Sequence, residues 1–233
     1  MEKILVITGG SRGIGKATIE VYKEKAWKVI NISRTPCDIP GVENFKVDLS
    51  KPDWVIKFQD DVKNTILTAE KISLVHNASI FNQDNITSLP AESLREVLEF
   101  NLISAQALNG IVIPIMRPGS SIIYIGSTLS EIGVSGRASY VISKHAIVGM
   151  MRATCQDLQG KDISTCCVCP GFVNTTMLTE QVNKKKLDAL VKDKVSAGRL
   201  IEPQEIAELI YFCATHPIVN GSVLHANLGQ ISN

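Results

Sequence analysis

Short apolar runs alternate along the chain with longer stretches in which apolar residues recur at helical spacing. The runs predict strands at residues 4–7, 28–32, 45–47, 72–75, 121–125 and 163–168. The helical spacing predicts helices at residues 14–24, 54–68, 92–109 and 140–158. Strict alternation of this kind implies right-handed crossovers and a doubly wound parallel sheet between two helical layers, a three-layer α/β/α fold.

The size and charge of the chain narrow the functional classes. Its 233 residues predict one domain over 1–233 with a large core. Lysine and arginine total 24 against 23 acidic residues, so the charge predicts neither a nucleic-acid partner nor an anionic membrane partner. The chain has no apolar stretch near 18 residues and begins directly with a strand, so we expect a cytoplasmic protein.

Three of the six cysteines cluster in the segment that holds Cys166, Cys167 and Cys169. Side chains alternate along a strand, so Cys166 should face away from the other two. Such a set cannot converge on one tetrahedral metal ion. We therefore predict no metal site and interpret these cysteines as small buried apolar residues.

A glycine-rich octapeptide, Thr8 to Gly15, follows the first strand and opens the first helix. Gly9, Gly13 and Gly15 allow a sharp turn and close approach of the backbone to a ligand, and N–H groups at the helix start can bind an anion. The pattern predicts a dinucleotide phosphate site. An ordinary strand-to-helix connection is the alternative, because glycine-rich turns also occur without a ligand.

A tyrosine and a lysine, Tyr140 and Lys144, lie one turn apart on one face of a predicted helix. An unperturbed phenol titrates near pH ~10, so it transfers protons efficiently at neutral pH only if a nearby positive charge favours the phenolate. Ser127, just past the predicted strand 121–125, is placed to donate a second hydrogen bond to the same substrate oxygen. The three residues predict polarisation and protonation of a carbonyl.

These motifs occur in the order and spacing typical of the short-chain dehydrogenase/reductase family, which the chain resembles over essentially its full length. The glycine turn Thr8–Gly15, the pair Asp48-Leu49, the segment Asn77-Ala78-Ser79 and the turn Pro170-Gly171 all match the family's pattern. Ser79 stands where the family usually has glycine, and Asn227-Leu228-Gly229 stands where many members have Asp-Gly-Gly.

The resemblance implies a Rossmann-type NAD(P)-binding fold and a nicotinamide-dependent oxidoreductase. It implies a catalytic tetrad of Asn101, Ser127, Tyr140 and Lys144. Tyr140 would be the general acid or base, Ser127 would orient the carbonyl, Lys144 would lower the phenol's pKa and hold the nicotinamide ribose, and Asn101 would fix a relay water. The cofactor-binding residues implied together by the turn, the motifs and the resemblance are Thr8, Gly9, Ser11, Arg12, Gly13, Ile14, Gly15, Ser33, Arg34, Asp48, Leu49, Asn77, Ala78, Tyr140, Lys144, Pro170, Gly171, Val173 and Thr175.

Some of these positions have structural alternatives. The alternative for Asn101 is a helix-interior amide satisfied by neighbouring backbone. The alternative for Asp48 is a turn or helix-cap residue. His76, at the end of a predicted strand, is interpreted as structural rather than catalytic.

Ser33 and Arg34 end the second strand, where NAD enzymes place an acidic residue on the ribose 2′-hydroxyl. A hydroxyl and a guanidinium suit a 2′-phosphate, and Arg12 in the glycine turn adds a second cation. We therefore expect NADP(H), and with it carbonyl reduction. The alternative is that both arginines are solvated surface residues and that NAD is accepted.

Residues 176–200 are interpreted as a substrate-side lid, with a lysine-rich first part that also fits an exposed helix pair with a basic face. Candidate residues for the wall of the substrate pocket are Leu129, Ile132, Val134, Phe172 and Leu178, each of which fits the core as well.

The general pattern is nearest to 3-oxoacyl-carrier-protein reductases, but Gln156 stands near where these tend to carry an arginine for the carrier protein. Arg117 or the lysines at 184–186 are the candidate substitutes. The alternative substrate is a small ketone, aldehyde, sugar or pterin-like carbonyl. The family also implies a homotetramer or homodimer. A non-catalytic cofactor sensor on the same fold is a further alternative, against which the intact tetrad argues.

Overall fold

The computed structural model describes residues 2–180 and 182–230 of the chain. The part of the chain that it describes contains one sheet of seven parallel strands in the order β3-β2-β1-β4-β5-β6-β7. The strands are β1 Lys3–Thr8, β2 Lys28–Ser33, β3 Val42–Lys46, β4 Lys71–His76, β5 Ser121–Ile125, β6 Ser164–Pro170 and β7 Val223–Ala226. The predicted parallel sheet is confirmed.

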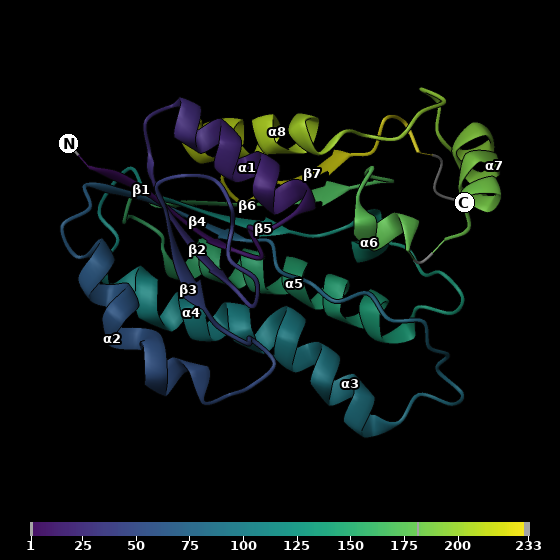
Figure 1. Cartoon of the computed structure of the whole chain (residues 1–233), viewed down its shortest axis with the longest axis horizontal. Helices are drawn as coiled ribbons and strands as arrows, with labels where there is room; N and C mark the ends of the chain where they lie inside the picture. The colour runs from purple at the N-terminus through teal and green to yellow at the C-terminus, as the bar shows by residue number, and fades with distance from the viewer. Residues whose placement is uncertain (1, 181, 231–233) are drawn as a thin grey trace.

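Helices cover both faces of the sheet (Figure 1). They are α1 Gly13–Glu24, α2 Trp54–Ile66, α3 Ala91–Leu98, α4 Ser104–Val112, α5 Ala138–Asp157, α6 Thr176–Thr179, α7 Lys184–Lys194 and α8 Pro203–Thr215. Helices α1 and α8 pack together on one face, and α2, α4 and α5 cover the other, which gives the predicted three layers.

The apolar runs form strands because both of their faces are buried. In β1, Ile4 and Val6 join the core beneath α2, α4 and α5, whereas Leu5 and Ile7 join the core beneath α1 and α8. A strand buried on both sides contains a continuous apolar run instead of an alternating pattern. The cysteines follow the same geometry, since Cys166 lies in one core and Cys167 and Cys169 lie in the other.

The structure differs from the expected elements in three places. The third strand is Val42–Lys46 instead of 45–47. Its apolar pattern is weak, so its bounds are set by its pairing with β2. The helix expected over 92–109 is divided by a π-helical turn at Glu99–Ile103. Helix α8 and strand β7 were not identified, although Pro203 and the Glu202/Glu205 capping box mark the start of α8.

The helical run Ala91–Ile115 is long and apolar enough, by length and composition alone, to cross a membrane, the single such stretch among the described residues. In this fold its segments α3 and α4 pack against α5 and α2 respectively. The run is thus part of the helical layer over the sheet.

The strand order reverses direction at β1 and β4, because β2 and β3 lie to one side of β1 and β4 to β7 lie to the other. Connections leave the sheet in opposite directions at such a point and open a crevice at the carboxyl ends of the strands. The glycine turn follows β1 and Asn77 follows β4 directly, so both are placed at this crevice.

Candidate functional site

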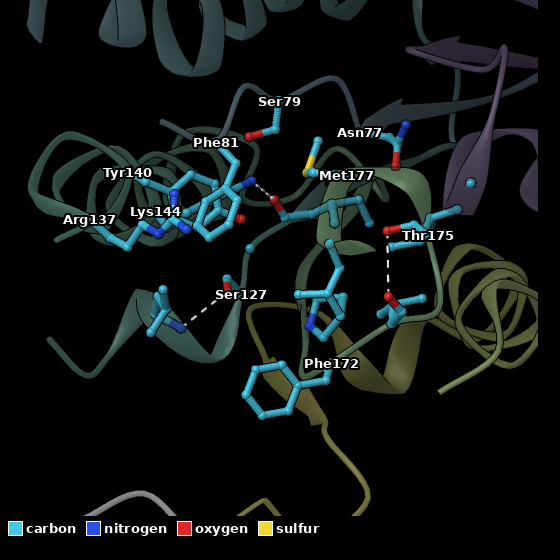
Figure 2. Close-up of a pocket in the computed structure, with 18 of the residues that line it drawn as sticks. Asn77, Ser79, Phe81, Ser127, Arg137, Tyr140, Lys144, Phe172, Thr175 and Met177 are labelled. Carbon is cyan, nitrogen blue, oxygen red and sulfur yellow. Dashed lines mark hydrogen bonds between the residues drawn. The ribbon is translucent and has the colours of Figure 1, made fainter. Parts of the chain in front are cut away.

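A cavity of about 1150 Å³ lies at the carboxyl ends of β1, β2, β4, β5 and β6 (Figure 2). Helix α6 and part of α7 contribute to its wall. Of the site residues expected from the sequence, those on its wall are Gly9, Ser11, Arg12, Gly13, Ile14, Ser33, Arg34, Leu49, Asn77, Ala78, Ser127, Tyr140, Lys144, Pro170, Gly171, Val173 and Thr175. The expected residues that do not line it are Thr8, Gly15, Asp48 and Asn101.

The glycine turn is shaped by steric requirements at defined positions. Gly9 and Gly13 have φ angles of 69° and 55°, in the left-handed region that favours glycine. A Cβ on Gly15 would lie 2.3 Å from the carbonyl oxygen of Gly9. The side chain of Arg12, which precedes α1, makes no capping hydrogen bond to the first N–H groups of that helix. This arrangement suits a phosphate.

Thr8 and Asn77 hold the turn against β4. The Thr8 hydroxyl accepts hydrogen bonds from the backbone N–H groups of Asn77 and Ala78, at 3.1 and 3.0 Å. The Asn77 amide donates to the carbonyls of Thr8 and Gly9, both at 3.0 Å. Thr8 and Gly15 therefore stabilise the shape of the glycine turn without lining the cavity.

The cavity wall is cationic. Arg12 and Arg34 line it and are exposed, and no Asp or Glu contributes to the wall within the described residues. The guanidinium of Arg34 lies 5.7 Å from the centre of the Phe100 ring. The Ser33 hydroxyl donates to the carbonyl of Thr35 at 2.6 Å and accepts from the Asn31 amide at 2.9 Å. Ser33 thus anchors the loop that carries Arg34.

Asp48 is placed as a turn residue, which was the alternative interpretation. Its carboxylate accepts hydrogen bonds from the backbone N–H and the hydroxyl of Ser50, at 3.1 and 2.8 Å. This is the Asx-turn geometry in which aspartate satisfies its own chain. The neighbouring Leu49 is buried and reaches the cavity wall in its place.

Ser127, Tyr140 and Lys144 meet at one end of the cavity (Figure 2). Ser127 caps a short 3₁₀ turn after β5, where its hydroxyl accepts from the backbone of Leu129 at 3.1 Å. Tyr140 and Lys144 project from α5, with the lysine nitrogen 5.4 Å from the centre of the phenol ring. That nitrogen donates to the carbonyl of Ile125 at 2.8 Å.

Burial dominates the titration of the phenol and the amine. It raises the pKa of Tyr140 to about 12, although the nearby Ser127 hydroxyl acts in the opposite direction. Burial also lowers the pKa of Lys144 to about 8. Desolvation of the phenolate is the largest cause of the raised pKa of Tyr140 and acts opposite to the lowering expected from Lys144. Tyr140 is therefore protonated at neutral pH and able to donate.

Asn101 lies in the π-helical turn, and its side chain makes three hydrogen bonds to protein groups. Its amide oxygen accepts from the backbone N–H of Ile80 at 2.8 Å. Its amide nitrogen donates to the Ile80 carbonyl at 3.1 Å and to the Ser143 hydroxyl at 3.0 Å. The side chain thus joins the loop after β4 to α5, one position before Lys144, as the structural alternative described.

His76 is buried away from the cavity. Its ring bonds to the Asn109 amide at 2.8 Å and stacks on Tyr124, with ring centres 4.9 Å apart. Burial lowers the pKa of His76 to about 4, so the ring is neutral at neutral pH. The structural interpretation of His76 is confirmed. Over residues 2–180 and 182–230, no group of three or more His, Cys, Asp or Glu side chains is placed to hold a metal ion.

The five apolar residues expected at the substrate pocket all line the cavity, namely Leu129, Ile132, Val134, Phe172 and Leu178. Sequence reasoning missed Phe81 and Arg137, which also line it. Arg137 is the residue immediately before α5, three positions before Tyr140, and that spacing was the available signal. Arg117 precedes β5 and therefore lies at the amino end of the sheet, away from the cavity.

Comparison with known proteins defines the family. The family model described as "Enoyl-(Acyl carrier protein) reductase" matches residues 9–230. A crystal structure of a short-chain dehydrogenase family protein from Francisella tularensis superposes with a TM-score of 0.90 at 28% identity and covers 98% of both chains. The chain belongs to the short-chain dehydrogenase/reductase family. The predicted family and fold are confirmed, and the coarse activity, that of an oxidoreductase, follows from them.

Several relatives of this short-chain dehydrogenase/reductase carry names that state a reaction. Carbonyl reductase family member 4 of Xenopus laevis is 29% identical over 96% of both chains. The 3-oxoacyl-(acyl-carrier-protein) reductase of Vibrio cholerae is 28% identical and covers 98% of this chain and 97% of its own. The aldohexose dehydrogenase of Thermoplasma acidophilum superposes with a TM-score of 0.87 at 25% identity, covering 100% of this chain and 97% of its own.

Proposed function

We propose that this short-chain dehydrogenase/reductase transfers hydride between NADP(H) and a carbonyl or secondary alcohol, with Tyr140 as the general acid or base. One observation carries the proposal: Ser127, Tyr140 and Lys144 converge at one end of a cavity whose wall also contains the glycine turn before α1. The nicotinamide supplies or accepts the hydride when it is bound.

The protein's own groups handle the proton and the developing charge. Tyr140, protonated at neutral pH, donates to the carbonyl oxygen during reduction, and Ser127 hydrogen-bonds the same oxygen. Lys144 places a positive charge beside the phenol ring and stabilises the phenolate left behind. The Ser127 hydroxyl is positioned by its hydrogen bond from the backbone N–H of Leu129, in the turn after β5. The Lys144 amine is positioned by its hydrogen bond to the carbonyl of Ile125, the last residue of β5.

The residues present fit NADP(H). The glycine turn and the open start of α1 suit the pyrophosphate, and Arg12 and Arg34 suit a 2′-phosphate. A wall whose described residues include no Asp or Glu does not repel that phosphate. Most cells keep their NADP(H) largely in the reduced form, so the proposed direction is reduction of the carbonyl.

Segment 176–200 acts as a lid in this proposal. Leu187, Val191 and Val195 form a small buried cluster outside the two large cores, and Phe172 and Leu228 pack against it. A segment with so small a core suits local movement. Met177 and Leu178 face the cavity from α6. Residue 181 of this lid, and residues 1 and 231–233 of the expected 1–233 domain, lie outside the described residues. The cytoplasmic location stays a prediction from the sequence, and the homotetramer or homodimer stays a prediction of the resemblance.

Two substrate classes are carried forward. The named relatives favour a 3-oxoacyl thioester or a small carbonyl. Lys186 is the one lysine of 184–186 that reaches the described cavity wall, so the other two and the distant Arg117 have no contact with the site. These residues therefore give little support for docking of a carrier protein at the cavity mouth.

The decisive test is Tyr140→Phe, assayed with NADPH over a panel of ketones, aldehydes and 3-oxoacyl thioesters. We expect turnover to fall about a hundred- to ten-thousandfold, because the acid is lost, while NADPH affinity measured by fluorescence changes less than about threefold. Comparable turnover by the two proteins would refute the assignment of Tyr140. Cofactor binding with no turnover by the wild type would instead support a cofactor-sensing regulator.

A further inference from the structure

Arg137 stands beside the reacting group, although no part of the proposed hydride transfer uses it. It lines the cavity at the residue before α5, three positions ahead of Tyr140. Its guanidinium carbon lies 3.9 Å from the centre of the Phe81 ring. The Phe81 ring in turn packs edge-on against Tyr140, with ring centres 4.7 Å apart (Figure 2). Phe81 therefore contacts both the cation and the phenol.

This contact restricts the guanidinium. Its carbon is held against the Phe81 ring, and all five N–H donors of a guanidinium lie in one plane. Arg137 is half-buried, so its charge is less screened than that of a surface arginine. A planar cation held in this way matches the two oxygens of a carboxylate.

One acidic residue acts on Arg137, but it stands outside the described cavity wall. The nearest acidic influence is Asp84, which raises the pKa of Arg137 against the lowering effect of burial. Asp84 accepts hydrogen bonds from the backbone N–H of Ser139, at 3.0 Å, and from the Ser139 hydroxyl. Asp84 does not line the cavity, whereas Lys144, Lys186 and Lys194 do. The described wall thus combines several cations with no carboxylate.

We propose that Arg137 determines specificity by binding a carboxylate on the carbonyl substrate, so that the enzyme reduces short oxo acids in preference to uncharged carbonyls. The inference rests on the proposed function, since it specifies the substrate of the same site. A carboxylate forms charge-assisted, two-pronged hydrogen bonds with a guanidinium, whereas an ester or thioester offers Arg137 only a carbonyl dipole. The apolar side chains of Leu129, Ile132 and Val134 surround the remaining short carbon chain.

The test compares matched substrates, namely a 2-oxo acid and a 3-oxo acid, each with its methyl ester, in the presence of NADPH. Wild type should have the higher kcat/KM for the acids. Arg137→Gln should reduce the acid-to-ester ratio of kcat/KM by about ten- to a hundredfold, because hydrogen bonds to a charged group are lost. Arg137→Lys, which keeps the charge without the planar fork, should lie between.

Arg152→Gln is the matched control, because Arg152 is exposed on the same helix and does not line the cavity. It should leave the acid-to-ester ratio unchanged. Binding of the 3-hydroxy acid and its methyl ester to the enzyme–NADPH complex, measured by calorimetry, provides a readout that needs no turnover. The hydroxy acid should bind wild type more tightly than the ester, and Arg137→Gln should remove the difference.

The two proposals fail separately. Equal rates with acids and esters, selective reduction of an acyl thioester, or an unchanged ratio in Arg137→Gln would overturn the role of Arg137 and leave the reductase intact. No turnover of any carbonyl, with the hydroxy acid still bound through Arg137, would overturn the reductase and support the anion site. Neither turnover nor selective binding would overturn both.

Discussion

Lys144 has opposing requirements at the scale of single residues. Its charge is needed beside Tyr140, yet burial disfavours that charge and lowers its pKa to about 8. The ammonium persists because its nitrogen donates to the carbonyl of Ile125. An amine with such a pKa is charged at neutral pH and loses the charge within a range that experiment can reach.

Activity should therefore fall as the pH rises through about 8, because the neutral amine no longer stabilises the phenolate. Initial rates between about pH 6.5 and about 9.5 should give kcat/KM for NADPH with a descending limb near pH 8, of roughly tenfold per unit. Lys144→Met, which has no titrating group, should be slow throughout and lack this limb. A flat profile in wild type would show that the charge of Lys144 is not required.

Arg34 is the residue by which the cofactor preference is tested. Arg34→Ala should weaken NADPH binding about ten- to a hundredfold and leave NADH binding little changed, because only NADPH carries a 2′-phosphate. Fluorescence titration of both cofactors measures this. The interaction is exposed, so added salt should diminish the difference. Equal effects on the two cofactors would contradict the phosphate role.

At the scale of elements, the connections after the strands position the site. The π-helical turn at Glu99–Ile103 brings the Asn101 amide to Ile80 and Ser143, and so links the loop after β4 to the helix that carries Tyr140 and Lys144. Such turns add one residue to a helical turn and are frequent at functional sites. The glycine turn after β1 is held in the same way by Asn77.

Gly15→Ala should open the glycine turn. Its Cβ would lie 2.3 Å from the Gly9 carbonyl oxygen and 2.6 Å from the Asn77 amide nitrogen, so both must shift. We expect a loss of about 1–3 kcal/mol of stability in urea unfolding, and weaker NADPH binding.

Gly110→Ala is the control for that substitution, because a Cβ at Gly110 in α4 meets nothing within 4 Å. Alanine there should stabilise the helix by about 0.5–1 kcal/mol and leave NADPH affinity unchanged. Wild-type NADPH affinity in Gly15→Ala would show that the close packing of the turn is not needed for the cofactor.

At the scale of the whole molecule, a buried polar network joins the sheet to the helices beneath it. His76 bonds to Asn109, whose amide donates to the Tyr124 hydroxyl at 2.9 Å, and that hydroxyl bonds to Thr154 of α5 at 2.9 Å. Buried networks of this kind are costly to disturb, because each member is desolvated. His76 is the member whose pKa folding lowers, from 6.5 to about 4.

Acid should destabilise the protein through His76. Its pKa falls from 6.5 when unfolded to about 4 when folded, so between these values the unfolded chain binds a proton that the folded chain does not. Stability is thus lost as the pH falls from 6.5 towards 4, by about 2 kcal/mol at pH 5.

Urea unfolding at about pH 7.5 and pH 5 measures this effect, with His76→Gln as the comparison because glutamine keeps an amide for Asn109 and does not titrate. The variant should lose about 2 kcal/mol less than wild type between the two pH values. An equal loss in both proteins would assign the acid sensitivity to other groups.

Local pattern determined most of the fold. Continuous apolar runs and helical spacing predicted the layers and the parallel sheet, because strands buried on both faces need apolar residues throughout. The same patterns failed at β3, where Val42–Lys46 has few apolar residues, and at the π-helical turn, which a spacing of 3.6 residues does not reveal.

The sequence by itself determined the family, the glycine turn and the order of Ser127, Tyr140 and Lys144, because these depend on residue type and spacing along one chain. Tertiary structure alone decided that Asp48 satisfies its own turn and that Asn101 binds Ile80 and Ser143. It also decided that burial sets the pKa of Tyr140 and that Phe81 holds Arg137 beside the phenol. Desolvation and contacts between distant segments arise only when the chain is packed, so no local pattern contains them.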